Sequence, residues 1–148
     1  MTCNLAARAV ALCAVLTVAA TTGAEASNMP SACSMIPLAD VRSTVGAPVK
    51  IINDNAPVVA YGVEATNCLY MVSLSGGMSV SVWLGRGPAG QMLAAHRAYA
   101  KVPQSRRGAE GLRGSTQVIV RVVTASAAGM AYHDALSAKL LAAVLAKL

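Results

Sequence analysis

The sequence predicts an α+β domain: an antiparallel sheet of four or five strands with helices packed on one face, an amphipathic C-terminal helix and one disulfide. Three observations predict this fold. Apolar and polar residues alternate in several short segments, as they do in half-buried strands. Other segments have apolar residues at helical spacing, and two cysteines remain beyond an apparent export signal. A chain of 148 residues has room for one such domain.

The first 26 residues have the pattern of a secretory signal peptide. Arg8 supplies positive charge, and the apolar core at 9–20 is shorter than the about 20 residues needed to span a bilayer. The small residues of Ala24-Glu25-Ala26 suit signal peptidase, so we predict cleavage after Ala26. The mature domain, 27–148, is then periplasmic or secreted and has no transmembrane segment. A lipoprotein is disfavoured, because Leu12 precedes Cys13 within the apolar core.

Cys33 and Cys68 are the cysteines left after cleavage, and in an oxidising compartment we expect them to form a disulfide. Such a bond would stabilise the fold by about 3 to 4 kcal/mol in the chain-entropy model. The alternative, a metal or redox site, is disfavoured because the spacing is not C-x-x-C and no histidine is nearby. We predict no metal and no cofactor.

The first half of the mature chain predicts a short helix followed by extended segments. Pro37 and Gly46 bound a helix at 38–45, since proline favours helix starts and glycine favours helix ends. A strand is expected at 49–52, a turn at 53–55, and a less well defined extended segment at 57–63.

The second half has the clearer pattern. Alternation at 68–74 and 78–84 around Ser75-Gly76-Gly77 predicts a β-hairpin. A helix is expected at 88–101, a polar loop at 103–115 and a strand at 116–124. After Gly129 we expect a helix to the C-terminus that docks through one row of apolar residues: Leu136, Leu140, Val144 and Leu148.

The two cysteine neighbourhoods support a family resemblance. Cys33 to Val41, the run Gly46-Ala47-Pro48-Val49 and the strand start Asn67-Cys68-Leu69-Tyr70 resemble small exported bacterial proteins and lipoproteins of unknown function. Those proteins have one cysteine before a short helix, another at a strand start, and a C-terminal helix. The resemblance implies the same fold and disulfide and no catalytic residue. The glycine-rich turn of many such proteins is reduced here to 108–114.

Catalytic motifs are weak. Common hydrolase and nucleotide-binding motifs are missing, and the acidic residues lie far apart in the sequence. His133 beside Asp134 could form a base with its orienting carboxylate, completed by a hairpin serine, but partly exposed helix histidines (His96 and His133) are the favoured interpretation. Gly85 to Gly90 matches G-x-G-x-x-G, yet it follows an antiparallel hairpin and contains Pro88, so a simple turn is favoured.

Positive charge is concentrated in one stretch of this chain of net charge +6. Glu110 is the single acidic residue among five cations: Arg97, Lys101, Arg106, Arg107 and Arg113. These cations form a candidate contact surface for an anionic envelope component (lipopolysaccharide, teichoic acid or peptidoglycan carboxylates) or for an acidic protein. The alternative is a solvated face without a partner. Nucleic acid is disfavoured, because the protein is exported and the stretch has no interleaved aromatic residues.

The function that these observations favour is a non-catalytic, exported cell-envelope protein that binds another macromolecule as an inhibitor, immunity protein or accessory factor. Two alternatives stay open. One is an exported hydrolase of unrecognised type. The other is a small-ligand carrier that uses the aliphatic space between sheet and helices.

Overall fold

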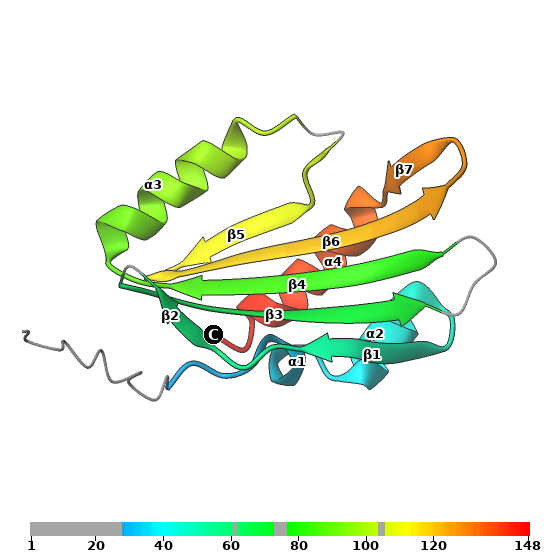
Figure 1. The fold of residues 1–148 in the computed structure, drawn as a ribbon, viewed down its shortest axis with the longest axis horizontal. Helices are drawn as coiled ribbons and strands as arrows, with labels where there is room; N and C mark the ends of the chain where they lie inside the picture. Colours follow the sequence, from blue (N-terminus) through cyan, green and yellow to red (C-terminus); the bar gives the residue numbers. More distant parts are fainter. Residues whose placement is uncertain (1–27, 61, 73–76, 104–105) are drawn as a thin grey trace, which may run out of the picture.

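A computed structural model describes residues 28–60, 62–72, 77–103 and 106–148 (Figure 1). The predicted cleavage after Ala26 and most of the predicted hairpin turn lie outside these residues. The elements in chain order are α1 (Ala32–Met35), α2 (Leu38–Val45), β1 (Val49–Asp54), β2 (Val58–Ala60), β3 (Val63–Val72), β4 (Met78–Arg86), α3 (Ala89–Ala100), β5 (Ala109–Arg113), β6 (Thr116–Ser126), β7 (Gly129–Tyr132) and α4 (Asp134–Leu145).

The strands form one antiparallel sheet. Its central path has the order β1-β3-β4-β6-β5, while β2 also pairs with β3 and β7 with β6. The predicted hairpin is β3 and β4, in which Tyr70 lies opposite Val80 and Cys68 opposite Val82. The structure therefore confirms the α+β fold class with a five-stranded core sheet and the C-terminal helix α4.

The core lies between one face of this sheet and helices α1, α2 and α4. Val82 and Val120 are fully buried and are paired across β4 and β6. From α4, Leu140 and Val144 pack into the same core, as their row in the sequence predicts. Leu136 is partly buried, whereas Leu148 lies beyond α4 and is exposed. We call this helix-covered face the inner face of the sheet.

The sequence predicts that the helices pack on one face of the sheet, but α3 packs on the other. It lies on the outer face, over β5 and β6. On β5, a Cβ at Gly111 would lie 2.8 Å from the Leu145 side chain of α4, so Gly111 faces inward. Side chains alternate along a strand. The neighbouring Glu110 therefore points outward, where it contacts His96 of α3. The sequence pattern does not distinguish the two faces for a helix with a single buried residue, Met92.

Two short strands lie where the sequence predicts a loop and the start of a helix. β5 lies in the expected polar loop at 103–115, and β7 occupies the first residues of the expected last helix, which begins only at Asp134. Both strands pair with the long β6, at 116–120 and at 123–126 respectively. Tertiary pairing thus overrides the weak local pattern of these glycine-containing segments.

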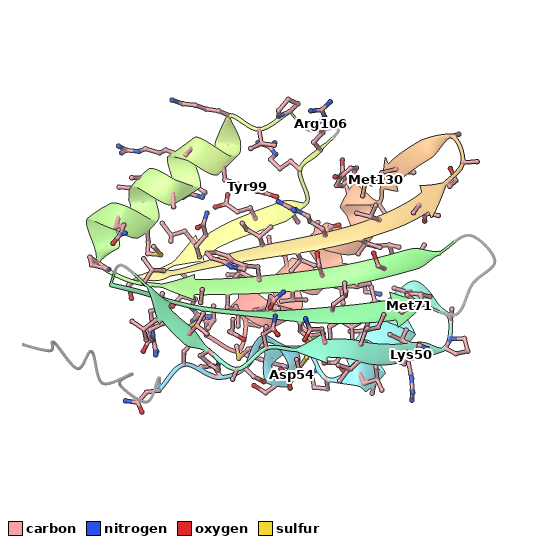
Figure 2. The ribbon with its side chains drawn as sticks, viewed as in Figure 1. Lys50, Asp54, Met71, Tyr99, Arg106 and Met130 are labelled. Atoms are coloured by element: carbon pink, nitrogen blue, oxygen red, sulfur yellow. A yellow bond between two sulfur atoms is a disulfide. The ribbon has the colours of Figure 1, made fainter. Side chains whose placement is uncertain are left out.

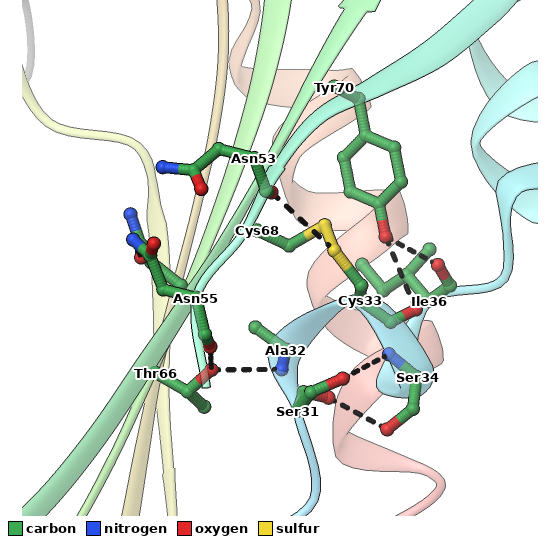
Figure 3. Close-up of a disulfide and its surroundings, with 11 residues drawn as sticks. Ser31, Ala32, Cys33, Ser34, Ile36, Asn53, Asn55, Thr66, Cys68 and Tyr70 are labelled. Atoms are coloured by element: carbon green, nitrogen blue, oxygen red, sulfur yellow. Dashed lines mark hydrogen bonds between the residues drawn. A yellow bond between two sulfur atoms is a disulfide. The ribbon is translucent and has the colours of Figure 1, made fainter. Parts of the chain in front are cut away.

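The predicted disulfide between Cys33 and Cys68 is confirmed (Figure 3). It joins α1 to the middle of β3 across the inner face, with the two Cα atoms 5.0 Å apart. Ser31 caps α1 by accepting a hydrogen bond from the Ser34 backbone N–H. Among the described helices, none has the length and apolar character required to cross a membrane.

Candidate functional site

The C-terminal end of α3 gathers exposed positive charge. The helix begins after Pro88 and stops before Pro103, which lacks the N–H that a further turn would need. Arg97 lies in its last turn, Lys101 is its C-cap residue, and Arg106 follows in the next segment. All three are exposed, and none pairs with a carboxylate in the described part of the chain. Figure 2 labels Arg106 beyond this end of the helix.

The other two predicted contact cations bind helix ends. Arg107 Nη1 donates to the carbonyl oxygen of Ala100 at 2.8 Å, and Arg113 Nη1 donates to that of Leu145. Both carbonyls belong to C-terminal turns, where the helix dipole favours positive charge. Arg107 and its neighbour Arg106 therefore follow the end of α3 that carries Arg97 and Lys101, whereas Arg113 lies at the far end of β5 and binds α4. We call Arg97, Lys101, Arg106 and Arg107 the cationic end.

The acidic residue of the same stretch is turned into the protein. The side chain of Glu110 is only 8% exposed. Its Oε1 lies 2.6 Å from Nδ1 of His96 and accepts a hydrogen bond of 2.7 Å from Nε2 of the buried Gln117. The Glu110 carboxylate is therefore engaged beneath α3 rather than presented beside the cations.

Tyr99 connects the cationic end to the sheet (Figure 2). Its hydroxyl accepts hydrogen bonds from the Gly108 N–H at 3.1 Å and from Nε of Arg121 at 3.4 Å. The Arg121 guanidinium also lies 5.7 Å from the ring centroid, a cation–π distance. Gly108 has to be glycine, because a Cβ there would lie 2.1 Å from the carbonyl oxygen of Val120. This close approach fixes the segment that carries Arg107.

The two histidines contact different partners. Nε2 of His133 lies 2.7 Å from Oγ1 of Thr124, at the junction of β7 and α4. Sequence reasoning missed the contact between His96 and Glu110, because 14 residues and an unpredicted strand separate the two. Recognising β5 would have been the signal, since it places Glu110 on the outer face.

The Gly85 to Gly90 segment is the predicted turn. β4 ends at Arg86, the Gly87 N–H donates to the Ser115 carbonyl at 3.2 Å, and α3 starts two residues later. The strand before the turn pairs antiparallel with both neighbours, unlike the parallel strand of a dinucleotide fold.

A surface cavity of about 400 Å³ lies next to the cationic end, between the start of β5 and α4. Its walls include Arg107 and Glu110 on one side and Asp134 and Leu141 on the other. In the described ranges, no group of three or more histidine, cysteine or acidic residues could hold a metal ion.

Comparison of the chain with models of protein families, with curated proteins and with solved structures gives no match. The candidate site is therefore defined by its own geometry: four cations at one helix end, fixed to the sheet by Tyr99 and Gly108, with their acidic neighbour buried.

Proposed function

We propose that this protein is exported through its N-terminal signal and acts without catalysis as a binding protein of the cell envelope. In this proposal the cationic end holds an anionic group of another macromolecule, either a polymer of the envelope or the acidic surface of a protein. The disulfide supports an oxidising compartment, because such bonds persist mainly outside the cytosol.

The observation that carries the proposal is the separation of charge around α3. Glu110 could neutralise the stretch, but its carboxylate is bonded to His96 and Gln117 beneath the helix. Arg97, Lys101 and Arg106 are left exposed without carboxylate partners in the described residues. Surface charges of one sign raise the local concentration of an oppositely charged partner and accelerate its association.

A rigid support makes these charges usable for recognition. Arg107 is fixed to the last turn of α3, and Tyr99 fixes the same turn to β5 and β6. Cations held at one place by the fold lose less conformational freedom on binding than cations on a free tail.

The proposal is tested by measuring association of the mature, oxidised protein with two immobilised anionic polymers, teichoic acid and poly-L-glutamate. A neutral polymer, polyethylene glycol, is the control. We expect saturable binding to at least one anionic polymer and an association rate that falls as salt concentration rises, because salt screens exposed charges. Binding to neither polymer above the control would contradict the proposal.

A further inference from the structure

A groove of about 520 Å³ lies on the outer face of the sheet, away from the cationic end. It is bounded by the segment before β2, by the start of β2 and by strands β3 and β4, where Figure 1 shows no covering helix. Its volume is within the range of about 300 to 1,000 Å³ typical of small-molecule sites. The residues that line it are Asn55, Ala56, Val58, Ala65, Thr66, Asn67 and Trp83.

Trp83, the one tryptophan of the chain, forms an aromatic wall of this groove. It pairs with Asn67 across β3 and β4, on the face opposite the buried Val82 and Leu84. Its six-membered ring lies over Gly85, since a Cβ at that glycine would be 2.1 Å from Cη2 of the indole. The ring is therefore laid along the strand and presents apolar surface to the groove.

Two amide side chains lie at the same groove. Nδ2 of Asn55 donates to Oδ1 of Asn67, which leaves Nδ2 of Asn67 and Oδ1 of Asn55 with capacity for a ligand. The backbone N–H of Asn55 also donates to the Asn67 carbonyl oxygen at 3.1 Å. The two amides thus offer one donor group and one acceptor group at adjacent positions.

Hydrogen bonds on the inner face hold the backbone that carries these amides (Figure 3). Oγ1 of Thr66 donates to the Asn55 carbonyl oxygen at 2.6 Å and accepts from the Ala32 N–H at 3.3 Å. Ala32 precedes Cys33, whose disulfide fixes α1 to Cys68 in the same strand. The backbone that carries the amides is therefore held before any ligand arrives, and the two amides are bonded to each other, which lowers the entropic cost of binding.

The chemistry of the lining selects the ligand. None of the seven lining residues is ionisable, so the groove favours a neutral ligand. A purely apolar ligand would leave Nδ2 of Asn67 and Oδ1 of Asn55 without a hydrogen-bond partner, which is costly. The ligand that complements this lining is a ring that has hydroxyl groups at its edge and C–H groups on its face. We propose that this groove binds a pyranose ring of a neutral saccharide, with the C–H face on Trp83 and hydroxyl groups on Asn55 and Asn67.

The single tryptophan makes the test direct, because its fluorescence reports on this groove alone. The full mature protein is titrated with maltotriose and with N-acetylated chitotriose, both neutral, up to about 20 mM, which would saturate a site of millimolar affinity. We expect a saturable change in the Trp83 emission with at least one of them. Asn67→Ala should weaken that binding about tenfold or more, whereas Ser81→Ala, on the same face outside the groove, should leave it unchanged.

The variant Trp83→Ala has no tryptophan fluorescence, so its binding needs a second readout. Binding to Trp83→Ala is followed by calorimetry, with folding checked by circular dichroism, and we expect loss of saccharide binding by a folded protein. Three results would overturn the proposal: no saturable change with either saccharide, equal binding by wild type and a folded Trp83→Ala, or a saturable change with terminally blocked trialanine but with neither saccharide. The last result would assign the groove to a peptide.

Discussion

The hydroxyl group of Tyr70 donates a hydrogen bond of 2.6 Å to the carbonyl oxygen of Ile36. This bond crosses from β3 to the segment between α1 and α2, two residues along β3 from the disulfide (Figure 3). The Tyr70 side chain is fully buried. Burial, followed by the negative charge of Asp54, raises the pKa of Tyr70 from 10.0 to about 12.

The first prediction is a loss of stability at alkaline pH. The folded protein holds the Tyr70 proton more tightly than the unfolded chain does. The contribution of Tyr70 to the free energy of unfolding is therefore complete below pH 10.0 and decreases as the pH rises towards about 12. Urea unfolding across this range should show a decreasing free energy of unfolding. Tyr70→Phe removes the titrating group and should flatten this dependence. An equally steep decrease in both proteins would contradict the assignment.

The second prediction concerns the disulfide. Cys33→Ala combined with Cys68→Ala should lower the free energy of unfolding by about 3 to 4 kcal/mol, because the unfolded chain regains the freedom that the closed loop removes. Urea unfolding measures the loss, and reduction of the wild type should reproduce it. Thiol titration of the oxidised wild type should find neither cysteine free. Wild-type stability in the double variant would be inconsistent with this role.

The third prediction tests the docking of α4. Leu140 is 1% exposed in the middle of the apolar row. Leu140→Ala should cost about 2 to 5 kcal/mol, as loss of a buried leucine side chain does elsewhere. The matched control is Lys139→Ala on the exposed side of the same helix, which should change stability by less than about 0.5 kcal/mol. Similar unfolding midpoints for the two variants would show that α4 docks by another face.

The fourth prediction tests the contacts under α3. Glu110→Ala removes the acceptor of Gln117 and the partner of His96, and should destabilise the protein by about 1 to 3 kcal/mol because a buried amide loses its hydrogen bond. Glu110→Gln keeps a carbonyl acceptor and should lose less. Denaturation of both variants measures the difference. A glutamine variant as unstable as the alanine variant would argue against the acceptor role.

The well-patterned parts of the fold were predictable from the sequence. Alternation in the β3–β4 hairpin and the leucine row of α4 both reflect burial on one face, so they appear directly in the residue order. β5 and β7 could not be found in this way. They are short, contain glycine, and form because β6 extends far enough to pair with both.

The charge of the candidate site was predictable from the sequence, but the arrangement of its residues in space was not. The concentration of cations between Arg97 and Arg113 is plain in the sequence. That Arg107 and Arg113 bind the ends of different helices depends on where α3 and α4 stop relative to β5. The burial of Glu110 likewise depends on its register on that strand, opposite Ile119.

Matched charge reversals separate a proposed contact of the cationic end with an anionic partner from a general effect of net charge. The test variant is Arg97→Glu with Lys101→Glu, and the control is Lys50→Glu with Lys139→Glu, all four being exposed positions. Each variant reverses two charges, so both have the same net charge.

The measurement is the association rate with immobilised teichoic acid and poly-L-glutamate at low and high salt, beside a thermal melt of each variant. We expect a rate about tenfold or more lower for the test variant at low salt, a smaller difference at high salt, and nearly wild-type rates for the control. Equal rates for the two variants would contradict the proposed contact.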